Sequence, residues 1–258
     1  MDRSALQSRL HISSIDENCR EHALPFGLGI EIAEFCWAYY IDCGREEHIE
    51  KCRDMMAGCD RFVFHAPFAE LAACAIDPRA RELARTRYTQ SVGLARELGI
   101  SRIVIHGGYI PYVYYPETYV SESVRFWKEF LKELPQGFEI MLENVMEPSP
   151  AMLVDIAKGV GDERLGLCLD IGHANTVVSE TLPMEWIEPM APYLKHVHIH
   201  NNRGERDTHN CLGDGSIPME ALLDKALALL PNATFTIENM YCADSLEWLK
   251  AHGYIEQR

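Results

Sequence analysis

Short apolar runs alternate with amphipathic segments along almost the whole chain. Each run has the length and the residue types of a buried strand. The pattern predicts eight strands, at Arg9–Ser13, Gly27–Ile32, Arg61–His65, Arg102–His106, Glu139–Glu143, Leu165–Asp170, His196–His200 and Thr234–Glu238.

Helices are expected between these strands. The segments Glu117–Leu134, Pro150–Lys158 and Met219–Leu230 have a helical pattern, and the connection after the first strand indicates a helix only weakly. The clearest helical segment is Arg79–Leu98, where apolar residues fall at positions that one helix face can bury. Those residues are Leu83, Val92, Leu94, Ala95 and Leu98.

This alternation predicts parallel strands joined by helical crossovers. The chain has 258 residues, and a closed (β/α)8 TIM barrel typically needs ~250. We therefore expect a single α/β TIM-barrel domain over residues 1–258. An open doubly wound sheet is the alternative, but no G-x-G-x-x-G motif follows an early strand to support dinucleotide binding.

The composition indicates an acidic, reduced protein. Because the formal net charge is −15, the chain is poorly suited to neutralise nucleic-acid phosphates, and we expect no nucleic-acid partner. Three bound divalent ions would change this charge to about −9. The nine cysteines contain no C-x-x-C pair, which is typical of a cytoplasmic protein. We expect no signal peptide and no membrane span.

Six consecutive predicted strands end in, or contain, a side chain that can bind a metal. In a barrel these strand ends all point to one mouth, which is where the active site lies. Loops add further donors near the same mouth. The nine side chains are His65, His106, Glu143, Asp170, His198 and Glu238 from the strands, and His173, Asp207 and His209 from the loops.

Imidazole and carboxylate groups together suit zinc, manganese or iron. A lone histidine at a strand end is usually a hydrogen-bonded core residue, but four carboxylates gathered at one mouth would be costly to bury without cations. The segment from Lys195 to Gly215 is especially rich in donors, because His196, His198 and His200 share one strand face. We therefore predict one to three divalent ions.

Seven motifs occur in an order that resembles one known superfamily. They are HAP, IHGG, LEN, LDIGHAN, HxHN, DxHxxLGxG and IEN. The chain resembles the xylose isomerase-like TIM barrels, which include AP endonuclease family 2 proteins and sugar phosphate isomerases and epimerases. The resemblance covers nearly the whole chain.

The resemblance implies a metal arrangement like that of endonuclease IV. One ion would bind His65, His106 and Glu143. A second would share Glu143 and add Asp170, His198 and Glu238. A third would bind His173, Asp207 and His209. In the ketose 3-epimerases of the superfamily only the second ion is present, and glutamates matching Glu143 and Glu238 are the acid/base pair.

The first functional hypothesis is therefore a metal-dependent isomerase or epimerase of a small sugar, sugar phosphate or related polyol. Glu143 and Glu238 would remove and return a proton, or would serve only as ligands. Glu31 would contact substrate, support a ligand histidine or form a salt bridge. His173, His200, Arg203 and Arg206 are further candidates for binding substrate hydroxyls or a phosphate, although the arginines also fit solvated loop charges.

Two other functions stay open. All nine donors are compatible with a trinuclear phosphodiesterase like endonuclease IV, and the chain could also be a non-catalytic sugar-binding module. Against a nuclease, Phe68 stands where the endonucleases have tyrosine, and the loop FCWAYYIDCG after the second strand contains no arginine. A homo-oligomer is compatible with the exposed aromatic residues expected in these loops.

Overall fold

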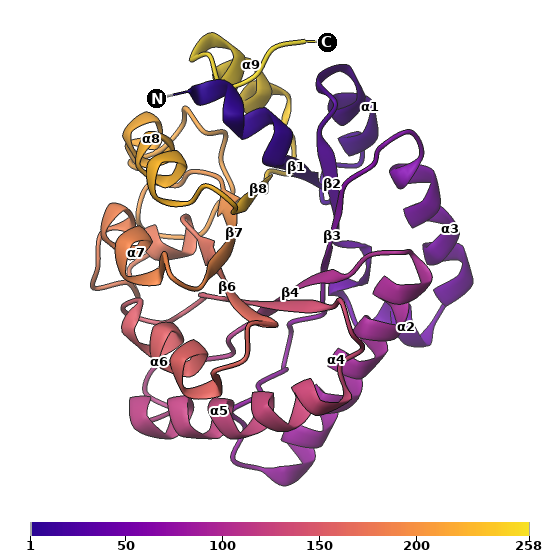
Figure 1. The fold of residues 1–258 in the computed structure, drawn as a ribbon, viewed down its shortest axis with the longest axis vertical. Helices are drawn as coiled ribbons and strands as arrows, with labels where there is room; N and C mark the ends of the chain where they lie inside the picture. The colour runs from indigo at the N-terminus through magenta and orange to yellow at the C-terminus, as the bar shows by residue number, and fades with distance from the viewer. Residues whose placement is uncertain (1, 258) are drawn as a thin grey trace.

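The computed structural model describes residues 2–257 and contains a closed barrel of parallel strands. The strands pair in sequence order, and β1 pairs with β8 to close the barrel (Figure 1). This confirms the predicted (β/α)8 fold. The strands are β1 Leu10–Ser13, β2 Gly29–Ile32, β3 Phe62–His65, β4 Arg102–His106, β5 Glu139–Glu143, β6 Leu165–Asp170, β7 Leu194–Ile199 and β8 Thr234–Ile237.

Helices surround the barrel on its outside (Figure 1). The four predicted helices are present as α4, α5, α6 and α8, with ends within two residues of those expected. The α-helices are α1 Cys19–Ala23, α2 Tyr39–Asp42, α3 Arg45–Met56, α4 Pro78–Glu97, α5 Pro116–Glu133, α6 Ala151–Val160, α7 Pro183–Met190, α8 Met219–Leu229 and α9 Ala243–Ala251. Short 3-10 helices are η1 Arg3–Arg9, η2 Leu24–Phe26, η3 Glu34–Cys36 and η4 His173–Asn175. Among residues 2–257, no helix has both the length and the apolar character that crossing a membrane requires.

Local sequence explains where several helices begin. Proline occupies the first helical position of α4, α5 and α7, where its missing N–H costs nothing. Before α4, the Asp77 side chain also accepts a hydrogen bond of 2.7 Å from the Arg79 backbone N–H. These signals fix where the chain turns from a loop at the barrel mouth into the outer layer.

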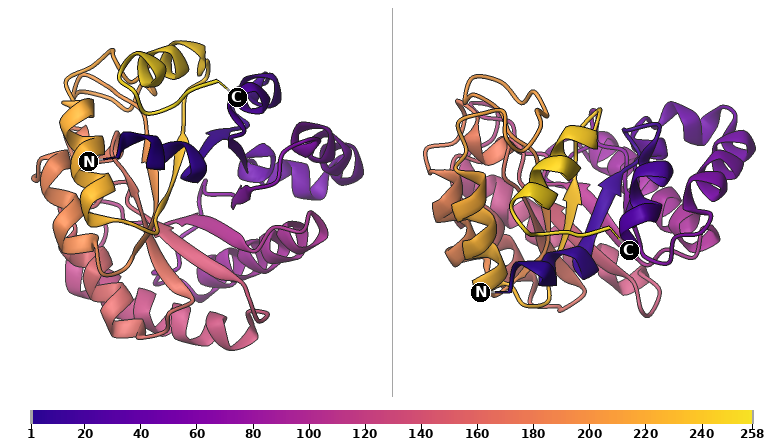
Figure 2. Two further views of the ribbon diagram at one scale, coloured as in Figure 1. Left: turned by 45° about the horizontal axis from the view of Figure 1, so that its top comes forward. Right: turned by 90° about the horizontal axis from the view of Figure 1, so that it is seen from above.

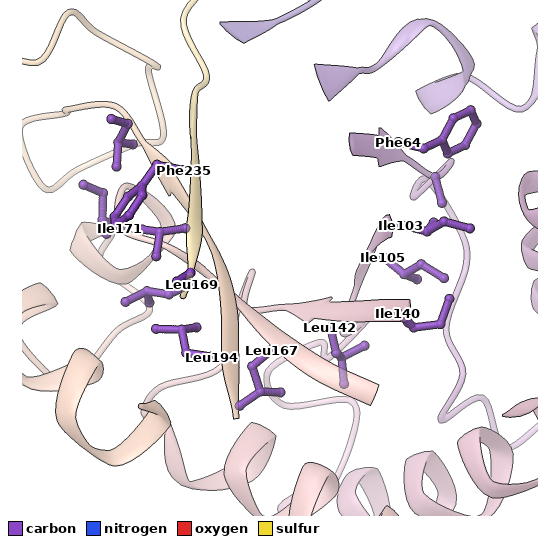
Figure 3. Packing of buried hydrophobic residues seen from close by; sticks show 14 of the residues in the cluster. Phe64, Ile103, Ile105, Ile140, Leu142, Leu167, Leu169, Ile171, Leu194 and Phe235 are labelled. Carbon is purple, nitrogen blue, oxygen red and sulfur yellow. The ribbon is translucent and has the colours of Figure 1, made fainter. Parts of the chain in front are cut away.

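The apolar core has an outer and an inner layer. The outer layer lies between strands and helices and includes Phe64, Ile103 and Leu142 (Figure 3). Inside the barrel, Val63, Val104, Met141 and Cys168 form a separate buried cluster.

The inner cluster explains how the strand ends are aimed. Side chains alternate across a strand, so a residue two positions later lies on the same face. Two residues after each member of the inner cluster come His65, His106, Glu143 and Asp170, respectively. An apolar floor therefore lies beneath a ring of potential metal donors.

The strand β7 differs from its predicted range. It spans Leu194–Ile199, so His200 lies just past its end. The chain turns there because Asn201 forms an isolated antiparallel bridge with Asn210. The segment between β7 and α8 lies at the end of the barrel to which the strands point (Figure 2), and it brings Asp207 and His209 to the mouth.

Candidate metal centre

The predicted donors converge at the mouth of the barrel. His65, Glu143, Asp170 and His198 are buried almost completely, and Glu238 is 8% exposed. Several groups of these side chains place ligand atoms close enough together to hold an ion, including His65, His106 and Glu143.

The first group is centred on one oxygen of Glu143. Its Oε2 lies 3.3 Å from His65 Nε2 and 3.4 Å from His106 Nε2, yet this buried oxygen has no hydrogen-bond partner among residues 2–257. Two donors bound to one tetrahedral zinc ion at ~2.0–2.2 Å lie about 3.3–3.6 Å apart. The spacing therefore fits a shared ion.

The second group surrounds one nitrogen of His198. Its Nδ1 lies 3.2 Å from Glu143 Oε1, 3.2 Å from Glu238 Oε2 and 3.7 Å from Asp170 Oδ2. These separations again match those of donors around a common ion. Glu143 thus faces both groups, with one carboxylate oxygen toward each.

The third group comes mainly from loops. Asp207 Oδ2 lies 3.3 Å from His173 Nε2 and 2.7 Å from His209 Nε2. The opposite ring nitrogens donate to backbone carbonyls: His173 Nδ1 to Asn144 at 2.9 Å and His209 Nδ1 to Glu238 at 2.7 Å. Each ring is held with Nε2 aimed at Asp207, which is how proteins orient metal-binding histidines.

Glu31 lies beneath the ring of donors. It is completely buried, and its Oε1 lies 3.1 Å from His198 Nε2. Its Oε2 accepts a hydrogen bond of 2.7 Å from the Thr236 hydroxyl and lies 2.9 Å from His196 Nε2. These contacts are compatible with two of the three roles considered for Glu31, the support of a ligand histidine and a salt bridge.

Burial and neighbouring charges shift the pKa values of the cluster in different directions. Burial by itself would lower the pKa values of His65, His173 and His198, but nearby acidic groups hold them well above their usual range. Burial by itself would raise the pKa of Glu143, but the imidazoles of His106 and His198 hold it well below its usual range. Burial lowers the pKa of His106 to about 3. At neutral pH, His106 is therefore a neutral ring with a free lone pair and Glu143 is a carboxylate, which are the forms that bind metals.

A cavity of about 670 Å³ opens above the donors. Both Glu143 and Glu238 line it, together with His65, His106 and the third group. His200 does not, because its Nε2 lies against both Asp170 oxygens at 3.1 Å. The exposed Arg203 forms a hydrogen bond of 2.5 Å with Asp214. Within the described part of the chain, the residues that line the cavity include neither Arg203 nor Arg206.

Sequence reasoning missed two contacts of the cluster. Thr236 supports Glu31, and its position two residues before Glu238 on β8 was a signal that it faces the barrel interior. The Cys36 sulfur lies 3.2 Å from His65 Nδ1, a nitrogen that also donates to the Ala66 carbonyl at 2.9 Å. Nothing in the sequence around Cys36 indicates that contact.

Residues 11–252 match a family model described as a xylose isomerase-like TIM barrel. Among curated relatives, the chain is 31% identical over 196 residues to the uncharacterised protein MJ1311 of Methanocaldococcus jannaschii, covering 72% of this chain and 66% of that protein. It is 26% identical over 170 residues to a protein of Mycobacterium leprae named "Probable endonuclease 4", covering 62% and 66%. The chain spans just under two thirds of the length of these relatives.

Solved structures of similar proteins match over almost the whole chain. A crystal structure described as a D-tagatose 3-epimerase-like protein has a TM-score of 0.76 and 25% identity, covering 95% of each chain. The TTHB071 protein from Thermus thermophilus, soaked with ZnCl2, has a TM-score of 0.74 and 25% identity, covering 94% of this chain and 97% of that one.

Proposed function

Since this chain belongs to the xylose isomerase-like TIM barrel family, we propose that it is a metal-dependent isomerase or epimerase of a small sugar, sugar phosphate or related polyol. The observation that carries the proposal is the placement of Glu143 and Glu238. Each has a carboxylate oxygen 3.2 Å from His198 Nδ1, and both line the cavity. Glu143 ends β5 and Glu238 directly follows β8, and these two strands are separated by β6 and β7.

The proposed metal ligands are the nine predicted donors in their three groups. The ions are zinc, manganese or iron, because imidazole and carboxylate donors suit these metals. The unpartnered Glu143 Oε2 and the separations of 3.3 and 3.4 Å to two imidazoles support the first group. The similar TTHB071 protein, whose structure is described as soaked with ZnCl2, supports zinc in particular.

The two glutamates lie on different sides of His198 in sequence order around the barrel, so their carboxylates can act on a bound substrate from two sides. When bound, a divalent ion polarises a substrate carbonyl and makes the adjacent C–H more acidic. One carboxylate removes that proton and the other returns it, on the opposite face for an epimerisation. Glu31 keeps the His198 ring in place from below, so the carboxylates keep their orientation around that ring.

The experiment that tests this proposal is solvent exchange. The metal-loaded protein is incubated with D-fructose and D-tagatose in D2O, and loss of the C–H signal at C3 is followed by NMR. Glu143→Gln and Glu238→Gln should each slow exchange about 10²–10⁴-fold, the usual worth of a general acid or base. Glu70→Gln is the matched control, because Glu70 also lines the cavity but is not one of the nine donors.

Metal analysis of the same samples separates the two roles of the glutamates. A variant that keeps its metal and loses exchange supports the acid/base role. A variant that loses both metal and exchange supports a ligand role only. Normal exchange in either variant would remove that glutamate from the mechanism, and no exchange in the metal-loaded wild type would contradict the proposed reaction on these ketoses.

A phosphodiesterase is the second candidate function. It is favoured by the complete set of nine donors and by the 26% identity to the mycobacterial "Probable endonuclease 4". Phe68, which lines the cavity without a hydroxyl group, and the absence of arginine and lysine from the cavity lining within residues 2–257 count against DNA as substrate. Robust incision of abasic-site duplex DNA by the metal-loaded protein would displace our first choice.

A further inference from the structure

The two sides of the cavity are formed by loops that follow different strands, and the two sets of loops contribute different kinds of side chain. The loops after β6, β7 and β8 contribute charged donors, namely His173, Asp207, His209 and Glu238. The loops after β2 to β5 contribute Trp37, Leu71, Ile110, Tyr114 and Met146. Because the strands follow sequence order around the barrel, we call these the charged half, which also contains Met240, and the apolar half, which also contains the carboxylate of Glu70.

The apolar half lies next to the donors. The Phe68 ring stacks on the His106 ring, with the ring centres 4.5 Å apart. Farther out, Trp37 is 63% exposed and Ile110 is 46% exposed. An apolar surface therefore extends from a proposed metal ligand to the rim. The cavity volume of about 670 Å³ lies within the ~300–1,000 Å³ typical of pockets for drug-sized ligands.

The cavity offers no obvious site for a phosphate away from the metals. Among the described residues, no lysine or arginine lines it, and Glu70 adds a carboxylate to its wall. Of the two glycines after β4, Gly107 has no free N–H for a phosphate, because it already donates to the Glu143 carbonyl at 2.8 Å. Phosphate groups are usually held by arginine, lysine or free backbone N–H groups.

We infer that the substrate is an unphosphorylated polyhydroxy compound that carries an apolar substituent. The hydroxyl-bearing end lies over the donors, and the substituent packs on the half formed by the loops after β2 to β5. This inference rests on the proposed function and narrows its substrate class. An aryl or branched alkyl substituent that packs on this wall leaves water, and this burial makes the compound bind more tightly than the unsubstituted polyol.

The test compares three ligands that share one polyol. D-Fructose, D-fructose 6-phosphate and 6-O-benzyl-D-fructose are titrated calorimetrically into the metal-loaded wild-type protein. We expect the benzyl derivative to bind about tenfold more tightly than D-fructose, and the phosphate to bind no better than D-fructose. Tighter binding of the phosphate, or no gain from the benzyl group, including no binding by any of the three, would overturn the inference.

Two isoleucine variants locate the effect. Ile110→Lys places a cation in the cavity lining, whereas Ile76→Lys changes an isoleucine that is 64% exposed and lies outside that lining. The first should reduce benzyl affinity about tenfold and strengthen binding of the phosphate, and the second should change neither. If the two variants bind the benzyl derivative and the phosphate equally well, the substituent does not pack on the half of the cavity that contains Ile110.

Solvent exchange measured on the same ligands separates the two proposals. If the benzyl preference holds and no C–H exchange occurs, the proposed reaction fails while the apolar binding wall stands. If exchange occurs and the phosphate is preferred, the reaction stands and the inference on substrate class fails.

Discussion

The charged and apolar halves of the mouth are built in different ways. Donors such as His173 and His209 are held by hydrogen bonds from their second ring nitrogen to a backbone carbonyl. On the apolar side, Trp37 and Ile110 extend into solvent from loops. The donor side therefore has its geometry fixed before ligand binds, which favours chemistry, whereas the apolar side can determine which molecule fits.

Substitution of a buried donor should lower the free energy of unfolding more than any other change at the mouth. His198→Ala removes the imidazole between Glu143 and Glu31 and takes one close partner from each of these buried carboxylates. We expect a loss of about 3–5 kcal/mol in the free energy of unfolding, together with loss of metal. Urea denaturation and metal analysis check this. His252→Ala, at a partly buried histidine that follows α9, is the control. Similar stability of the two variants would contradict a preorganised donor side.

The pH dependence of the metal-free protein probes the loop donors. Burial by itself would lower the pKa of His209, but the Asp207 carboxylate raises it from 6.5 to about 9. A raised pKa means that the stabilisation is complete below pH 6.5 and is lost as the pH rises through about 9. In EDTA, unfolding free energy should fall by up to about 3 kcal/mol between these limits. His209→Gln should lack this loss, and an unchanged profile in that variant would assign the dependence elsewhere.

Substitution of Glu31, behind His198, should weaken metal binding less than loss of a proposed metal ligand. Glu31→Gln keeps the side-chain volume and an oxygen for the Thr236 hydroxyl, so we expect the fold to persist. Metal affinity should fall about 10–100-fold, as when other partners of metal-bound histidines are changed. Competition with a chelating dye measures this. Wild-type affinity in the variant would show that His198 needs no carboxylate behind it.

The apolar rim should contribute least to stability. Trp37→Ala changes a side chain that is 63% exposed, so the free energy of unfolding should stay within about 0.5 kcal/mol of the wild type. Metal content should also be unchanged. A loss above about 1 kcal/mol in urea denaturation would mean that the rim is part of the packed core.

The fold was predictable because the strand and helix patterns differ in period. Ranges such as Arg102–His106 and Glu139–Glu143 agree with β4 and β5 at both ends. The helix α3 was missed because it buries only Ile49, Cys52 and Met55 among many charged residues. The helix α7 was missed although Pro183 begins it, and it contains a second proline, Pro189.

The donor positions were predictable, but most of their supporting contacts were not. Residues at the ends of parallel strands meet at one mouth whatever the register. Contacts across the barrel, such as Glu31 with His196 and Thr236, join strands that are distant in sequence and depend on the register. The direction of Arg203 toward Asp214 depends on loop conformation, for which the sequence pattern carries no signal.

Anomalous scattering from crystals of the metal-loaded protein tests the central claim most directly. It gives the identity and the number of bound metals in one measurement. We expect a peak among His65, His106 and Glu143, a second beside His198 between Glu143 and Glu238, and a third at Asp207 when all sites are filled. Metal peaks that lie away from these side chains, or none after loading, would contradict the account.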